Sequence, residues 1–187
     1  MNNKRLYPIL CAFSLLTLPA LAQDDVPTSK PNAIVPYKTA VGLRMSPTLI
    51  YGPELTITAK HFIRPESALE AEIGIVNYNR SYLASLQYVW QPQLLTSKRF
   101  RPYVGIGLGV TGTNYTPHAE KQDFETNLVG LTKFGIEYTF PKVPIALSLD
   151  YRHAFYGYKT DDYKHVPLNR LNNIGFGLKY TFGKRLY

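Results

Sequence analysis

Histidines, together with serine and acidic residues able to act with them, have the most direct capacity for chemistry in this 187-residue chain. A serine nucleophile needs a histidine base within hydrogen-bond reach, and that base is usually oriented by an acid. Ser81, His118 and Asp123 could form such a set, although nothing in their spacing requires it. His153 is followed by alanine and phenylalanine, so it has no serine two residues after it. We therefore predict no catalytic residue.

Asp161, Asp162 and His165 carry the donor atoms of a cation site. Two adjacent acids in a polar stretch are more often solvated, so we predict neither a metal nor a cofactor. The one cysteine, Cys11, lies in an N-terminal segment that we expect to be removed. A disulfide framework and a cysteine-based site are therefore excluded in the mature chain.

Another set of charged residues has a regular spacing. Within several segments these residues share one parity with glycine, serine and threonine, whereas large apolar residues take the other parity. Alternation of this kind is typical of β-strands, whose successive side chains point to opposite faces. We expect these charges to form a polar network on one face of the strands. The members of the predicted network are Arg44, Lys60, Glu70, Glu72, Lys133, Glu137, Asp150, Arg152 and Lys179.

About eight such strands are needed to position these residues. They are predicted near 37–45, 55–60, 69–75, 81–91, 101–113, 128–140, 145–152 and 172–182. Tight turns at 64–67 and 141–144 alternate with polar loops, of which 114–126 and 156–170 are the longest. The first turn should place Lys60 opposite Glu70 or Glu72, and the second should bring Lys133 near Asp150 and Arg152. We expect these turns to supply the partners that buried charges require.

Alternation alone does not say which face lies inside a closed sheet. A soluble barrel of the lipocalin kind would be apolar within and polar outside. The polar face of this chain is rich in glycine, which suits a narrow lumen, and its charges are mixed in sign. The aromatics at the strand ends fit an interfacial girdle, and eight strands leave little free volume inside. We therefore predict a membrane barrel with a packed polar lumen. The predicted girdle consists of Trp90, Tyr138, Phe140, Tyr180 and Phe182.

The N-terminus has the features of an export signal. Lys4 and Arg5 precede an apolar run, and Ala20-Leu21-Ala22 has the small-x-small form of a cleavage site. We predict a signal peptide over 1–22, a flexible periplasmic leader over 23–36 and a barrel over 37–187. Loss of Lys4 and Arg5 with the signal peptide lowers the formal net charge from +8 to +6 (19 Lys and Arg minus 13 Asp and Glu), and this excess favours contact with anionic lipid or lipopolysaccharide. Nucleic acid is a poor partner, because the basic residues of this exported chain never cluster.

Three segments carry a family resemblance: RPYVGIGLG at 101–109, IALSLDYRHAF at 145–155 and IGFGLKYTF at 174–182. They resemble strands of the small eight-stranded outer-membrane barrels, the OmpA/OmpX group. The resemblance implies an all-β, antiparallel up-and-down transmembrane barrel in the outer membrane of a Gram-negative cell, inserted by the barrel assembly machinery. Such barrels commonly end on the last strand's aromatic, whereas here five residues follow Phe182. Tyr187 takes that terminal role, or the short tail is tolerated.

The resemblance supports fold and location more than activity. We expect a non-enzymatic, monomeric barrel with a structural role, or a surface-binding role through its extracellular loops. Some barrels of this size modify lipid A, so an acyltransferase or deacylase of lipid A is the alternative.

Overall fold

A computed structural model describes residues 34–47, 53–76, 81–94, 96–113, 125–157, 166 and 171–183. The chain divides into two compact units, 1–31 and 32–187, and the barrel belongs to the second. The predicted signal peptide and residues 23–33 of the predicted leader lie outside the described residues. The tail residues 184–187, including Tyr187, lie outside them too. None of the described helical residues belongs to a helix long and apolar enough to cross a membrane.

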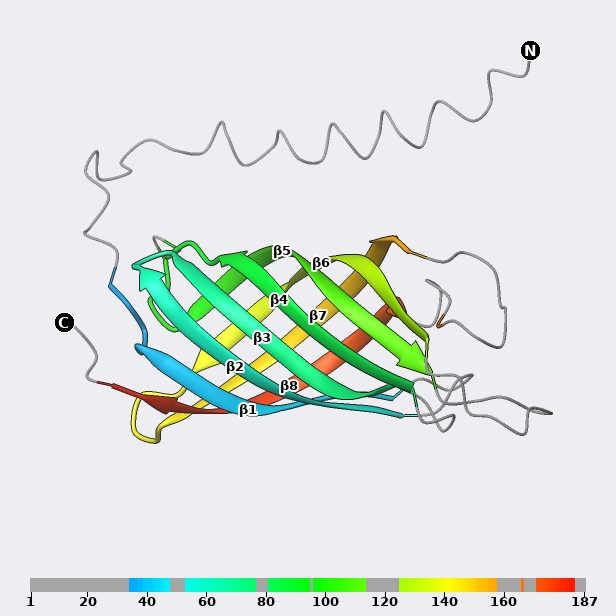
Figure 1. Cartoon of the computed structure of the whole chain (residues 1–187). Helices are drawn as coiled ribbons and strands as arrows, with labels where there is room; N and C mark the ends of the chain where they lie inside the picture. Colours follow the sequence, from blue (N-terminus) through cyan, green and yellow to red (C-terminus); the bar gives the residue numbers. More distant parts are fainter. Residues whose placement is uncertain are drawn as a thin grey trace, which may run out of the picture. The chain divides into compact units, whose positions relative to one another are not determined.

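The barrel is a closed, eight-stranded, antiparallel sheet in which each strand pairs with its neighbours in sequence and β1 pairs with β8 (Figure 1). Closure gives every strand two partners, so no open sheet edge remains. This confirms the predicted all-β, up-and-down fold. The strands are β1 Thr39–Ser46, β2 Glu54–Arg64, β3 Ser67–Val76, β4 Ser81–Trp90, β5 Phe100–Thr113, β6 Glu125–Thr139, β7 Ile145–Tyr156 and β8 Asn173–Phe182.

The strands form where the sequence alternates, because one face of each strand is enclosed and the other is not. In β8, Ile174, Phe176 and Leu178 are exposed outside the barrel, whereas Gly175 and Lys179 are buried inside it. The same pattern runs along β2, where the buried residues except Phe62 are polar and most of the exposed ones are apolar. Polar groups therefore line the lumen, and apolar side chains cover the outer wall.

The two ends of the barrel differ, as Figure 1 shows. At the end here called the turn end, residues 65–66, 91–99 and 140–144 join consecutive strands. The opposite end, here called the loop end, carries the β1–β2, β3–β4, β5–β6 and β7–β8 connections. Because β6 begins at Glu125, the first of the two longest loops is shorter than predicted. The second spans 157–172 between β7 and β8, close to the predicted 156–170. The 114–124 segment and most of 157–172 lie outside the described residues.

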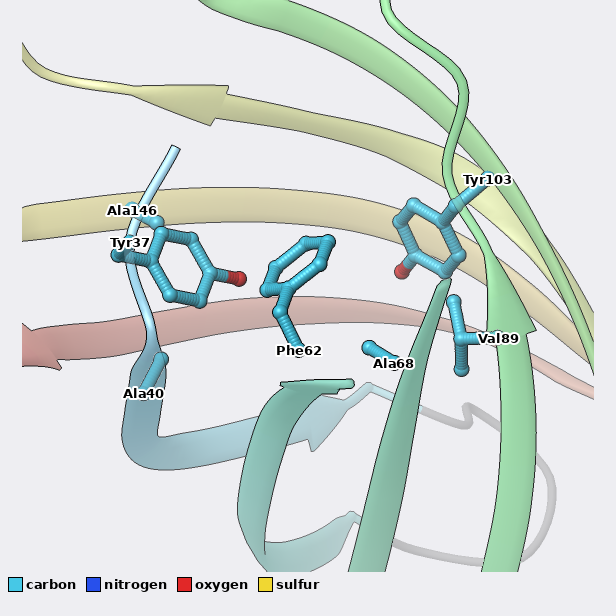
Figure 2. Packing of buried hydrophobic residues seen from close by; sticks show 7 residues of the cluster. All are labelled: Tyr37, Ala40, Phe62, Ala68, Val89, Tyr103 and Ala146. Atoms are coloured by element: carbon cyan, nitrogen blue, oxygen red, sulfur yellow. The ribbon is translucent and has the colours of Figure 1, made fainter. Parts of the chain in front are cut away.

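The lumen is not polar throughout, because an apolar cluster closes it near each end. The turn-end cluster consists of Tyr37, Ala40, Phe62, Ala68, Val89, Tyr103 and Ala146. Figure 2 shows the rings of Tyr37, Phe62 and Tyr103 together inside the barrel, and the first two meet edge to face with centroids 5.2 Å apart. The loop-end cluster consists of Leu83, Val129, Leu131, Ala154, Val166 and Leu171.

Two members of the loop-end cluster, Val166 and Leu171, come from the β7–β8 connection that we interpreted as a polar surface loop. Val166 is 4% exposed and Leu171 is fully buried. They pack against lumen-facing residues such as Leu83 and Leu131. The connection therefore contributes apolar side chains to the lumen itself.

Candidate functional site

The centre of the lumen holds a network of charged side chains. The structure places all nine predicted members there, and none is more than 4% exposed. Glu54, at the start of β2, joins them and is 1% exposed. These ten residues, five cations and five carboxylates, are here called the lumen network. Side chains buried this deeply need partners for their charges and for their hydrogen-bonding atoms.

Glu137 of β6 is the centre of the half nearer the turn end. Its carboxylate is 3.3 Å from Nζ of Lys60 and 3.4 Å from Nζ of Lys179. Tyr37 donates a hydrogen bond to it at 2.6 Å, and the Gln91 amide donates another at 3.1 Å. Burial and the neighbouring Glu137 carboxylate raise the pKa of Tyr37 well above its ordinary value, so its hydroxyl stays a donor. One carboxylate thus holds two cations and the segment preceding β1.

Glu70 and Glu72 of β3 form the next layer of ion pairs. Nζ of Lys133 lies 3.0 Å from Glu70 and 2.6 Å from Glu72. Nζ of Lys179 lies 2.8 Å from Glu70. Through these contacts β3 is tied to β6 and β8, which are not its neighbours in the sheet. The network therefore joins opposite walls of the barrel.

The half nearer the loop end is built on two arginines. Arg152 of β7 binds both carboxylate oxygens of Glu54, at 2.7 and 2.6 Å, in the bidentate geometry that the planar guanidinium favours. Arg44 of β1 pairs with Asp150 at 2.7 Å and with Glu54 at 3.4 Å. The Asn173 amide donates to Glu54 at 2.7 Å and accepts from Arg44 at 2.9 Å. This half holds β1, β2, β7 and β8 together.

The hairpin registers agree with the sequence, whereas the ion-pair partners differ. Lys60 lies opposite Glu70 as predicted, yet its ion pair is with Glu137 across the lumen. Lys133 lies opposite Arg152, two residues along the strand from the position opposite Asp150, yet it pairs with the carboxylates of β3. Long side chains in a narrow lumen reach the opposite wall, so the nearest hairpin neighbour is not the only available partner. The expectation that the turns supply the partners is wrong for these two lysines.

Glu54 was missed, although the sequence contained the necessary signal. It has the same parity as Thr56, Thr58 and Lys60, so extending the second strand by one residue would have placed it in the lumen. Its carboxylate is the partner that Arg152 needs. Tyr37 and Tyr103 were also missed, because they are aromatic residues that face inward among polar ones. Tyr103 donates a hydrogen bond to Asp150 at 3.0 Å.

Gly175 provides a test of the network's packing. A Cβ at this position would overlap the guanidinium of Arg44, which Asp150 and Asn173 hold in place. Gly175→Ala should therefore displace Arg44 and destabilise the barrel by about 2 kcal/mol. The matched control is Gly105→Ala, where the new Cβ would lie 3.2 Å from its nearest neighbour. That variant should cost less than about 1 kcal/mol in urea unfolding, and equal costs would contradict the argument.

The five predicted girdle aromatics lie together at the turn end, on the outer wall. Trp90, Tyr180 and Phe182 are each about half exposed, and Tyr138 and Phe140 are partly buried. The rings of Tyr138 and Phe140 are 5.0 Å apart between centroids, and those of Tyr180 and Phe182 are 4.8 Å apart. The aromatics thus form one pair at the end of β6, where Phe140 follows the strand, and another on β8, with Trp90 on β4.

The residues considered for catalysis are not brought together in the described part of the barrel. His153 is exposed on the outer wall and stacks on Tyr151 at 6.4 Å between ring centroids. His61 is exposed and bonds to Thr39 at 2.8 Å. Ser81 is buried at the loop end, and the other candidates, His118, Asp123, Asp161, Asp162 and His165, lie outside the described residues. Among the described residues there is no group of three metal-ligating side chains.

The fold is shared with solved structures. The chain is similar to the N-terminal β-barrel domain of Pseudomonas aeruginosa OprF, with a TM-score of 0.57 and 15% identity over 77% of this chain and 96% of that one. The fold is that of the small OmpA/OmpX-type barrels. A de novo designed transmembrane β-barrel is also similar, with a TM-score of 0.50 and 15% identity over 81% of this chain and 97% of that one. No family model and no curated protein matches the chain.

Proposed function

We propose that this protein is an integral outer-membrane barrel without enzymatic activity. The barrel is a stable platform, and the connections at its loop end are the surface through which it binds partners outside the cell. The turn end faces the periplasm and the loop end faces outward, as in barrels with short periplasmic turns and longer external loops. Its partners are membrane lipid and lipopolysaccharide, with the barrel assembly machinery as the route of insertion, and it acts as a monomer.

One observation carries the membrane location: the outer wall is apolar on all eight strands. Every strand contributes at least three large apolar side chains that are exposed. Among the described strand side chains that face outward, the one Lys, Arg, Asp or Glu is Arg64, at the turn end of β2. Monomeric soluble proteins rarely expose a contiguous apolar surface of this size. Lipid tails are the environment that such a wall requires.

The interior supports a structural role over a catalytic one. A general base or nucleophile must be accessible to a substrate, whereas the carboxylates of the lumen network are enclosed and paired with cations. Apolar clusters close the lumen on both sides of that network. The network therefore ties the strands to one another, and recognition is left to the connections at the loop end.

The location is tested by fractionation and by heat-modifiable gel migration. The full chain should fractionate with the outer membrane and need detergent for solubility. The folded barrel should migrate faster than the boiled chain, because a closed barrel in detergent stays compact. A protein that remains soluble and folded without detergent would contradict the membrane location.

The absence of enzymatic activity is tested on lipid A. Mass spectrometry should give the same acyl pattern for lipid A from cells with the protein and from cells without it. A gained or lost acyl chain that depends on the protein would favour the lipid A-modifying alternative. In that case, alanine variants of Ser81 and His118 would identify the residues responsible.

A further inference from the structure

Arg101 is a buried cation of a different kind from those in the lumen network. It lies at the start of β5 at the turn end and is 1% exposed. Its guanidinium donates to the carbonyl oxygens of Ile34, Lys98 at 3.3 Å and Pro65 at 3.5 Å, and to the amide oxygen of Gln93 at 3.1 Å. These acceptors are neutral. Four of its five N–H donors are used, and one on Nη1 remains.

Among the described residues, Arg101 is the buried cation in the barrel interior for which no buried carboxylate remains as an ion-pair partner. Six cations and five carboxylates are buried there, and the ten members of the lumen network pair with one another. The two carboxylates nearest in the fold have other partners. Glu137 pairs with Lys60 and Lys179, and Glu66 accepts the backbone N–H of Gln93 at 3.1 Å. A buried charge without a counter-charge is costly, so the site favours an anion.

A cavity of about 340 Å³ lies directly beside Arg101. Lys98 and Arg99 also line it, and both are exposed at the turn end. No carboxylate is among its lining residues, so three cations face the space together. The remaining wall includes Thr139 and the largely apolar segment 34–36. The volume is that of a small ligand rather than of a single ion, which fits a charged group carrying an organic part.

We propose that this cavity binds a phosphate group. The planar guanidinium of arginine donates paired hydrogen bonds to phosphate oxygens, and the ammonium group of lysine adds a concentrated positive charge. The Thr139 hydroxyl supplies a further hydrogen-bond donor. The apolar residues 34–36 suit the part of a phospholipid that lies between its phosphate and its acyl chains. Two sources have this chemistry, an anionic phospholipid of the periplasmic leaflet and free phosphate. The lipid source rests on the proposed membrane location, whereas free phosphate does not.

The test uses two double variants of the full-length chain. Arg101→Gln removes bonds to three backbone carbonyls and is liable to misfold, so the exposed Lys98 and Arg99 are changed to glutamine instead. The matched control changes Lys38 and Lys142 to glutamine. Both control residues are exposed at the same end, and neither lines the cavity. Heat-modifiable migration verifies that each variant is folded before binding is measured.

The lipid arm uses native mass spectrometry of the detergent-solubilised protein with phosphatidylglycerol or phosphatidylcholine. The unaltered chain should retain phosphatidylglycerol preferentially. The Lys98/Arg99 variant should bind it about tenfold more weakly, whereas the Lys38/Lys142 variant should change less than about twofold. Equal weakening in both variants would show attraction to surface charge alone and would overturn the proposal.

The second arm titrates inorganic phosphate by calorimetry. Binding that is weakened by the Lys98/Arg99 variant alone would identify free phosphate as a sufficient ligand. If phosphatidylglycerol binds and inorganic phosphate does not, the lipid headgroup is the source. If neither binds to the unaltered chain, the site is refuted. A protein that folds without detergent would refute the membrane location, yet its cavity would still be tested by this arm.

Discussion

Glu137→Gln is expected to destabilise the barrel by about 3 kcal/mol or more. The substitution keeps the shape of the side chain, but it replaces one acceptor oxygen with an amide donor and leaves Lys60 and Lys179 without the carboxylate they share. Both lysines are buried, so water cannot replace the lost counter-charge. Removing one partner of a buried ion pair commonly costs about 3–5 kcal/mol, because the other charge is left unpaired.

Urea unfolding in detergent measures this loss, with Trp90, the single tryptophan, as the fluorescent probe. Glu66→Gln is the matched control, because Glu66 lies in the β2–β3 turn and is only partly buried. That change should cost less than about 1 kcal/mol.

A double-mutant cycle tests the pairing itself. Combining Glu137→Gln with Lys60→Gln should destabilise the barrel by at least about 1 kcal/mol less than the sum of the single changes. Strict additivity would show that Glu137 stabilises the barrel without pairing with Lys60.

Leu86→Arg is expected to destabilise the barrel by about 2–4 kcal/mol in a lipid bilayer. Leu86 lies in the middle of β4, is 57% exposed on the outer wall and stands opposite Ala71 and Leu108. An arginine at this height meets hydrocarbon, which cannot solvate its charge. The same exposed position on a soluble barrel would tolerate arginine with a change of about 0.5 kcal/mol or less. The experiment therefore distinguishes the two environments by energy.

The control for depth is Leu128→Arg, on β6 near the loop end. Leu128 is 52% exposed, so the two leucines differ mainly in their distance from the end of the barrel. Near the bilayer interface the cost should be about 0–1 kcal/mol, because arginine reaches the headgroups and water. Unfolding in lipid vesicles is the measurement. Equal, small costs at both positions would contradict a membrane-embedded wall.

The predictable part of this fold rests on local chemistry. The alternation from Ile174 to Phe182 recurs in seven other segments, and all eight form strands. The tight turn after Arg64 sets the register that places Lys60 opposite Glu70. Strand ends were harder to predict, because Glu54 continues the alternation of β2 directly after a glycine–proline loop signal.

Parity predicted which charged residues face the lumen, but it did not predict which of them form ion pairs with one another. Parity assigns Lys60, Lys133 and Lys179 to one face of their strands, and that assignment needs no knowledge of the other strands. Their carboxylate partners lie on strands across the barrel, at positions that depend on closure and on the stagger between strands. The apolar clusters at the two ends were not predicted either, since Val166 belongs to a polar stretch of sequence.

The sequence by itself determined the number of strands, their order and which side chains point to each face. These properties follow from a period of two residues and from turn chemistry, both of which act between near neighbours in the chain. The tertiary structure decided which charges meet, where the lumen is closed and that Arg101 has neutral hydrogen-bond partners. Those outcomes depend on distances across a closed barrel, because residues far apart in sequence become neighbours there only after β1 has paired with β8.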